Sequence, residues 1–145
     1  RTWYFEAFAA DLNAAGFRVV PKTAPWAPDY VSRVNAGTAG HLNIIGWIAD
    51  FADADNFIGT FFQTVNPQFG NFENPEIFAK LDEAEAETDP DRRTELYQEA
   101  NRLIADFVPG VPYVHNQPAV AFAEGISGYV PGPLNNESFA VVTVE

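Results

Sequence analysis

Three aspartates lie within six positions of the segment GWIADFADADNF, residues 46–57. They are Asp50, Asp53 and Asp55. Trp47 and Phe57 flank them, and the segment contains no basic residue. Carboxylates grouped in this way can bind a metal ion, perform acid–base chemistry, cap a helix or receive a cationic ligand. Each role requires different neighbours, so the surrounding sequence can separate them.

A calcium loop of the EF-hand type is not indicated by the spacing. Such a loop needs oxygen ligands at positions 1, 3 and 5, glycine at position 6 and glutamate at position 12. Counted from Asp50, position 3 is Ala52 and position 6 is Asp55. Counted from Asp53, position 6 is Ile58. A looser oxygen-ligand site remains open, and with it the alternative of a metal-dependent hydrolase fragment that uses all three aspartates.

Other elements of a catalytic or transition-metal site are missing from the sequence. His41 and His115 are the only histidines, and neither has a partner at ligand spacing. There is no cysteine, no G-x-S-x-G motif and no phosphate-binding glycine loop. A carboxylate pair for glycoside hydrolysis would need a second acidic cluster at a comparable strand end. We therefore expect no catalytic residue, no metal ligand, no cofactor and no enzyme activity in this chain.

Capping and ligand recognition can divide the three aspartates. Asp53 directly precedes a predicted short helix, where its carboxylate can accept hydrogen bonds from free N–H groups. Asp55 lies in the first turn, where a negative charge favours the helix dipole. Asp50 follows a predicted strand, and ligands of open α/β sheets bind outside the carboxyl ends of strands. Beside Trp47 it suits an ammonium or hydrogen-bonding ligand. The alternative is that Trp47 is a core residue and Asp50 caps a turn.

The composition limits the partners of the chain. Its 145 residues suffice for one domain with a core, and 47% hydrophobic content argues against disorder. The net charge of −12 disfavours nucleic acid and anionic membrane surfaces as partners. No run of about 18 apolar residues is present that could span a membrane. The chain lacks methionine and opens at Arg1 inside a predicted helix, so we expect a piece of a longer protein.

The apolar pattern of the first third predicts an α/β fold, with a mixed sheet flanked by helices. Residues 3–15 form a predicted helix that Gly16 ends, and 17–23 form a strand. A second helix is expected within 24–37 and a second strand over 41–47. The order of helix, strand, helix and strand indicates parallel strands with crossover helices. The expected buried faces of the two helices are Phe5, Phe8, Leu12 and Ala15, and Tyr30, Val31 and Val34.

Helices also dominate the predicted middle of the chain. A short helix is expected over 54–63, and the pairs Asn74-Pro75 and Asp89-Pro90 each read as an N-cap followed by proline at the first helical position. The expected core residues of the two long helices are Ile77, Phe78, Leu81 and Ala84, then Leu96, Ala100, Leu103, Ile104 and Phe107. Their charged residues are interpreted as a solvated face. Extended chain at 111–125, a turn-rich connector and a strand at 138–145 complete the prediction.

The segment at 46–57 resembles the G-W-x-x-D-[YF]-x-D-P-x-N-[FY] signature of extracytoplasmic solute-binding proteins of family 5, the peptide- and nickel-type receptors of ABC importers. Segments 10–37, 74–117 and 125–133 resemble this family in the same order, so the resemblance covers nearly the whole chain. One departure is Ala54, where the family usually has proline.

The resemblance implies a role, a fold and a site. Residues 1–145 would be a single domain, most of the second lobe of a two-lobed protein with a type II periplasmic-binding-protein-like fold. The ligand would be a small peptide or another small solute, with Asp50 pairing with an α-amino group and Trp47 lining the same pocket. The expected partners are the missing N-terminal lobe and the ABC permease. The expected location is periplasmic or extracellular, with a lipoprotein-type anchor in a missing N-terminal segment.

Overall fold

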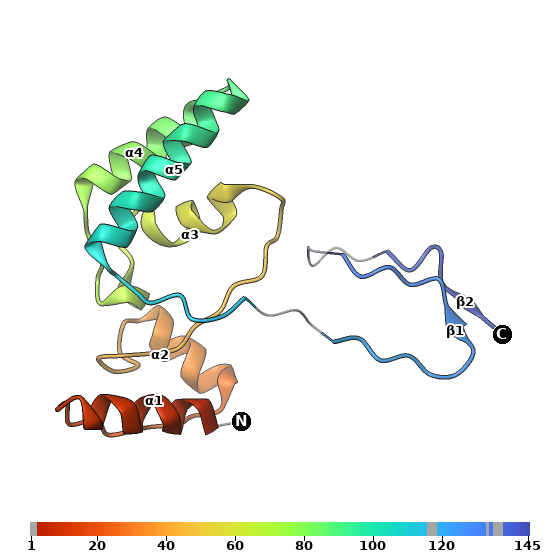
Figure 1. Ribbon diagram of the computed structural model, residues 1–145, viewed down its shortest axis with the longest axis horizontal. Coiled ribbons are helices and arrows are strands. Elements are labelled where there is room, and N and C mark those ends of the chain that lie inside the picture. The colour runs from red at the N-terminus through yellow and green to blue at the C-terminus, as the bar shows by residue number, and fades with distance from the viewer. Residues whose placement is uncertain (1–2, 116–118, 133, 135–137) are drawn as a thin grey trace.

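The chain forms a stack of helices followed by an extended C-terminal segment (Figure 1). The computed structural model is described for residues 3–115, 119–132, 134 and 138–145. Its elements are α1 (Trp3–Ala14), the helical turn η1 (Trp26–Tyr30), α2 (Val31–Asn35), the turn η2 (Ala54–Asn56), α3 (Ile58–Phe62), the turn η3 (Pro67–Phe69), α4 (Pro75–Ala86), α5 (Pro90–Phe107), β1 (Ile126–Ser127) and β2 (Thr143–Val144). The described part of the chain is therefore rich in helix and has one small sheet.

Helices α4 and α5 lie side by side as a hairpin, and both begin where the sequence predicts. The Asn74 side chain accepts hydrogen bonds from the backbone N–H groups of Glu76 and Ile77 at 3.1 and 3.3 Å. The Asp89 carboxylate accepts one from the N–H group of Arg92 at 2.8 Å. Each cap precedes a proline at the helix start, which lacks the N–H group that would otherwise need a partner.

The hydrophobic core lies along the hairpin and beneath it. Its buried residues are Phe72, Ile77, Leu81, Ala84, Leu96, Tyr97, Ala100 and Ile104. Burying each large aliphatic side chain contributes roughly 1.5–3 kcal/mol. Phe78 and Leu103 pack against this core while partly buried, in line with the prediction. Phe107 was also expected in the core, but it is exposed at the end of α5, with only a ring contact to Phe72.

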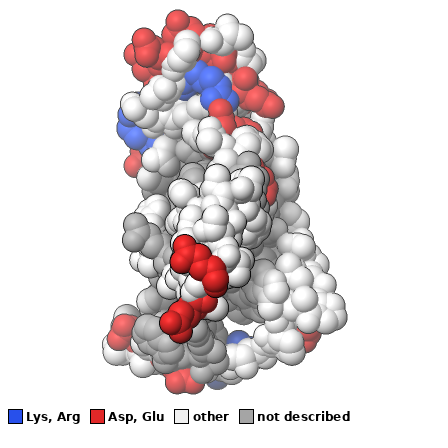
Figure 2. All heavy atoms as spheres, turned by 90° about the vertical axis from the view of Figure 1, so that its right-hand side faces the viewer, with Lys and Arg blue, Asp and Glu red and all other residues white. Residues whose placement is uncertain are grey.

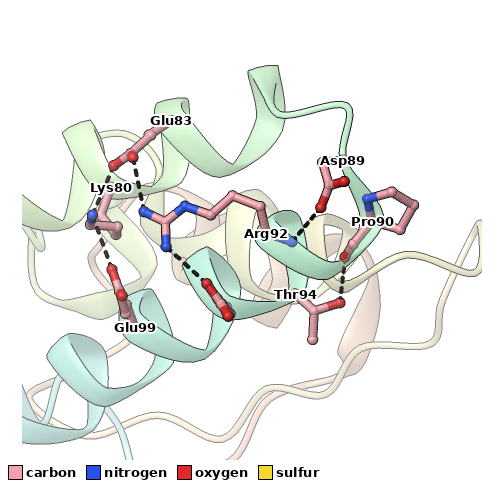
Figure 3. A network of polar contacts seen from close by, with 8 residues as sticks. Lys80, Glu83, Asp89, Pro90, Arg92, Thr94 and Glu99 are labelled. Carbon is pink, nitrogen blue, oxygen red and sulfur yellow. Dashed lines mark hydrogen bonds and ion pairs between the residues drawn. The ribbon is translucent and has the colours of Figure 1, made fainter.

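The outer face of the hairpin carries a network of ion pairs (Figure 3). Lys80 lies 2.8 Å from Glu83 and 3.2 Å from Glu99. Arg92 contacts Glu83 at 3.6 Å and Glu95 at 3.0 Å. Acidic and basic side chains accordingly gather at the top of Figure 2. Exposed pairs of this kind contribute about 0–1 kcal/mol each, so this face is mainly a solvated one, as predicted.

The strands predicted at residues 17–23 and 41–47 are wrong for this structure, in which both segments are irregular. A strand persists only when a neighbouring strand pairs with its N–H and C=O groups. The described residues supply no such neighbour here. Side chains pair with the backbone instead. The Tyr30 hydroxyl donates to the carbonyl of Ile44 at 2.7 Å and accepts from its N–H group at 2.9 Å.

Without strands in these two segments, the expected parallel sheet with crossover helices is not formed by the described residues. Helix α1 is present where predicted, but Phe8 and Ala15 of its expected buried face are exposed. The helix expected within 24–37 is reduced to η1 and α2, with Val34 buried and Gly37 following it. Prolines at positions 25 and 28 explain the shortening, because a residue before proline avoids helical backbone angles.

The C-terminal segment holds the sheet. Strand β2 is shorter than the strand predicted at 138–145, and β1 lies in the segment predicted as a turn-rich connector. Strand β1 pairs with β2 in antiparallel register, Ile126 opposite Val144 and Ser127 opposite Thr143. Gly128 has φ +82°, and a Cβ there would lie 2.1 Å from the carbonyl oxygen of Val141, so glycine is required. The described parts of 111–125 are not paired as strand, and residues 116–118 lie outside the description. None of the helices in the described ranges is long and apolar enough to cross a membrane.

Candidate functional site

The segment 46–57 folds around the buried side chain of Asn56, which is 3% exposed. The Asn56 Oδ1 atom accepts a hydrogen bond from the indole Nε1–H group of Trp47 at 3.1 Å. The same oxygen accepts one from the backbone N–H group of Asp50 at 2.9 Å. One buried acceptor therefore ties together the two residues that the sequence predicts as ligand contacts.

Trp47 rests against an aromatic cluster that extends into the core. Its ring meets Phe61 of α3 edge-on, with ring centroids 5.2 Å apart and an interplanar angle of 83°. Phe61 contacts Phe62 and Phe69, and Phe62 contacts Phe72. Edge-to-face pairs of this kind are favourable because ring edges are positive and ring faces negative. Trp47 is nevertheless 42% exposed, so part of its indole stays available to a ligand.

Asp53 caps the helical turn η2 and also forms an ion pair with Arg93 of α5. Its Oδ1 atom accepts a hydrogen bond from the N–H group of Asp55 at 2.8 Å, which confirms the predicted cap of the short helix. The Arg93 guanidinium of α5 makes a two-pronged contact, 2.7 Å to Oδ2 and 3.0 Å to Oδ1. The hydrogen bonds from Arg93 hold the pKa of the Asp53 carboxyl below its ordinary value of 3.8, against the opposing effect of burial. Asp53 thus fastens the loop to α5.

Asp55 is held by the same group of side chains. The Tyr97 hydroxyl donates to Asp55 Oδ1 at 3.3 Å and accepts from Arg93 at 3.1 Å. Arg93 also lies over the Tyr97 ring, 4.7 Å from its centroid. Burial, aided by the negative charge of Asp55, raises the pKa of Tyr97 to about 12. A Cβ at Gly59 would lie 2.0 Å from Asp55 Oδ1, so any other residue at this position would displace the Asp55 carboxylate.

Asp50 differs from the other two aspartates. Its residue is exposed, and only its backbone N–H group is held, by Asn56. Within the described ranges, no hydrogen bond or ion pair involves its carboxylate. Asp53 and Asp55 are committed to the contacts that shape the loop. Asp50 is therefore the aspartate of this segment that is free to meet a cation from outside.

The arrangement does not gather the three aspartates into a metal site. Among the described residues, no three His, Cys, Asp or Glu side chains are placed to hold one ion together. Asp53 already faces the guanidinium of Arg93, and a cation there would compete with that pair. The hydrolase alternative therefore lacks the converging carboxylates that it requires.

Two hollows flank the loop. One, of about 420 Å³, is apolar and lies between Ala49, Phe57 and Leu134 of the C-terminal segment. The other, of about 620 Å³, lies between Ala52 of the loop and the face of α5 that carries Gln98. Both hollows border the segment 52–54, and neither is lined by Trp47 or Asp50.

Three residues of the site were not identified from the sequence. Arg93 was assigned to a solvated face, and Tyr97 was not placed in the core. Asn56 matches the family signature, but no role was predicted for it. Arg93 and Tyr97 are spaced i, i+4 and so lie on one helix face, which was an available signal. Nothing local indicates that this face meets Asp53, 40 residues earlier.

Comparison with known proteins shows which proteins this chain is similar to. It is 32% identical over 145 residues to Heme-binding protein A of Haemophilus influenzae, covering 97% of this chain and 26% of that protein. It is 26% identical to Di/tripeptide-binding protein 4 of Pseudomonas aeruginosa, covering 94% of this chain and 26% of the relative. It is 27% identical to the Dipeptide-binding protein of Escherichia coli, covering 97% and 26%. These relatives are binding proteins by name.

The similarity confirms the predicted resemblance, and the chain is related to the family 5 solute-binding proteins over nearly its whole length. The chain spans about a quarter of the length of these relatives. No family model matches the sequence. No solved structure matches it either.

Proposed function

We propose that this chain is the ligand-binding part of the second lobe of a solute-binding protein for an ABC importer. The observation that carries the proposal is the contrast between the free carboxylate of Asp50 and the committed carboxylates of Asp53 and Asp55. Asp50 sits in a loop fixed from the inside, beside a partly exposed indole. That is a suitable receptor for the ammonium group of a peptide.

The ligand class that we propose is short peptides with a free α-amino group. The names of two of the relatives specify di- and tripeptides, which supports this choice. The relative at 32% identity is named for heme, so heme is the second candidate ligand. Heme has no ammonium group and carries negative propionates, so its binding would not be lost when the Asp50 charge is removed. The two candidates therefore differ in a measurable way.

Only part of the binding site would reside in this chain. In the proposed whole protein, the ligand lies between two lobes and hinge closure buries it. Main-chain hydrogen bonds can hold an extended peptide while tolerating varied side chains. The closed form would deliver the ligand to a membrane permease. The proposal places the protein in the periplasm or outside the cell, anchored through a segment that precedes this chain, and assigns it no enzyme activity.

The test is a thermal-shift assay on the full-length parent protein and its Asp50→Ala variant. The panel contains di- to penta-peptides, hemin, oligosaccharides and metal chelates. Ligands that bind the native state raise the melting temperature in proportion to RT ln(1 + [L]/Kd). We expect a rise with peptides that Asp50→Ala loses. A rise with hemin, sugars or chelates that survives the substitution would keep the receptor role and overturn the peptide assignment.

Asp82→Ala is the matched control for this assay. Asp82 is an exposed aspartate of α4, and its carboxylate accepts only a hydrogen bond from Gln63 among the contacts described. Its removal takes away one negative charge without touching the loop. We expect the peptide-induced shift to be unchanged in this variant. Equal losses in both variants would mean that overall charge, and not the position of Asp50, attracts the ligand.

A further inference from the structure

A single buried oxygen controls the relative placement of Trp47 and Asp50. Asn56 Oδ1 accepts from the Trp47 indole at 3.1 Å and from the Asp50 backbone at 2.9 Å. Asn56 is 3% exposed, so its side-chain oxygen is removed from water. A buried polar group is costly unless it is hydrogen-bonded. The Asn56 oxygen therefore requires the two donors, the indole N–H of Trp47 and the backbone N–H of Asp50.

The shape of the loop keeps Asn56 away from any ligand. Its backbone belongs to the turn η2, where its N–H group donates to the carbonyl of Asp53 at 3.2 Å. Asp53 in turn is fixed by Arg93 on α5. Asn56 is therefore buried and held on both sides, by the turn through its backbone and by Trp47 and Asp50 through its side-chain oxygen.

We infer that Asn56 is the positioning residue of the candidate site. It fixes the backbone of Asp50 relative to the indole of Trp47. It thereby determines how strongly the site prefers a ligand with an ammonium group over the same ligand without one. This inference rests on the proposed function. Its physical basis is preorganisation: Asn56 fixes the backbone of Asp50, so less of the loop has to be ordered when the ligand arrives.

The preference for an amine separates positioning from ordinary stabilisation. A peptide and its N-acetylated form have the same side chains, but only the free peptide carries the ammonium group. The Kd of the N-acetylated form divided by the Kd of the free peptide measures how well the Asp50 charge is placed. A substitution that only weakens the fold lowers both affinities together and leaves the ratio unchanged.

The experiment uses the full-length protein with alanylphenylalanine and N-acetyl-alanylphenylalanine as probes, titrated by calorimetry. Asn56→Leu removes the acceptor while nearly keeping the volume of the side chain. The Asp50 backbone then loses its anchor beside Trp47, so we expect the Kd ratio to fall by about tenfold or more. Asn56→Ser, whose shorter side chain cannot reach both donors, is the second variant should Asn56→Leu fail to fold, with the same expected loss.

A second readout observes Trp47 itself. The indole Nε1–H resonance of Trp47 in nitrogen-15 spectra, assigned with Trp47→Phe, reports its hydrogen bond to Asn56. We expect this resonance to move in Asn56→Leu and to stay in place in Asn74→Ala. Asn74→Ala is the matched control because it also removes an asparagine whose side-chain oxygen accepts two backbone hydrogen bonds. Asn74 caps α4 and has no hydrogen bond to Trp47 or Asp50.

The outcomes separate the inference from the proposed function. Equal binding of both probes by the wild-type protein, or a wild-type ratio unaffected by Asp50→Ala, overturns the proposed amine site and the inference with it. A wild-type ratio that Asp50→Ala abolishes but that the Asn56 variants retain leaves the proposed function intact and overturns the inference alone. A ratio lost in the Asn56 variants, kept in Asn74→Ala, and accompanied by a moved indole resonance supports both.

Discussion

The three aspartates of one short segment have different roles because their neighbours differ. Asp53 faces Arg93 and a helix start, Asp55 faces Tyr97, and the carboxylate of Asp50 has no such contact in the described structure. Sequence position alone identified the cap at Asp53, since a cap depends on residues two or three positions away. It could not identify Arg93, because that contact depends on how α5 packs against the loop.

The Asp53–Arg93 pair makes stability depend on acidity. Because the folded pKa of Asp53 is below its ordinary value of 3.8, its stabilisation is fully present above the unfolded pKa. It is lost as the pH falls from about that value through the folded one. Asp53→Asn should therefore lower the free energy of unfolding by about 1 kcal/mol at neutral pH, because the ion pair with Arg93 is lost while the cap is kept. Urea unfolding of both proteins should converge below pH 3.8.

Asp89→Asn is the matched control for that pH dependence. Asp89 caps α5 through a hydrogen bond from Arg92 N–H, and no ion pair involves it among the described contacts. Asparagine is as good a cap as aspartate, so little change is expected at neutral pH. A difference between wild type and Asp53→Asn that stays constant from neutral to acid pH would show that the charge of Asp53 contributes nothing.

At the scale of elements, local signals were sufficient where an element depends on its own residues. The caps and apolar spacing of α4 and α5 predicted both helices and most of the buried residues, including Leu81 and Leu96. The strands at 17–23 and 41–47 could not be settled in the same way, because a strand requires a partner that the segment itself does not specify. The apolar residues of these segments favour extended backbone, but a strand forms only where a neighbouring strand packs against them.

The hairpin is the element whose stability can be tested directly. Leu81 is fully buried between α4 and α5, so Leu81→Ala leaves a cavity and should cost about 2–5 kcal/mol. Leu42→Ala is the matched control in this 145-residue chain, since Leu42 is 72% exposed and its truncation should cost less than about 0.5 kcal/mol. Both are measured by far-ultraviolet circular dichroism in urea. Equal losses would contradict the placement of the core along the hairpin.

At the scale of the whole molecule, exposed apolar side chains occur along the segments that were expected to be strands or extended chain. Phe17 is 65% exposed, Leu42 72% and Val111 79%. Single exposed apolar residues are ordinary, but several along extended segments mark a surface that prefers to be covered. The chain spans about a quarter of its relatives, and we propose that the remainder of the protein covers these segments with pairing strands.

This proposal predicts a difference in amide hydrogen exchange between the 145-residue chain and its full-length parent. A backbone N–H group exchanges slowly when it is paired in a stable sheet and quickly when it faces water. Amides at 17–23 and 41–47 should exchange rapidly in the isolated chain and slowly in the parent. Those of α4 and α5 should be protected in both, because the hairpin core is complete within this chain. If 17–23 and 41–47 exchange rapidly in the parent as well, their apolar side chains do not belong to a sheet, and the proposal that the rest of the protein pairs with them is wrong.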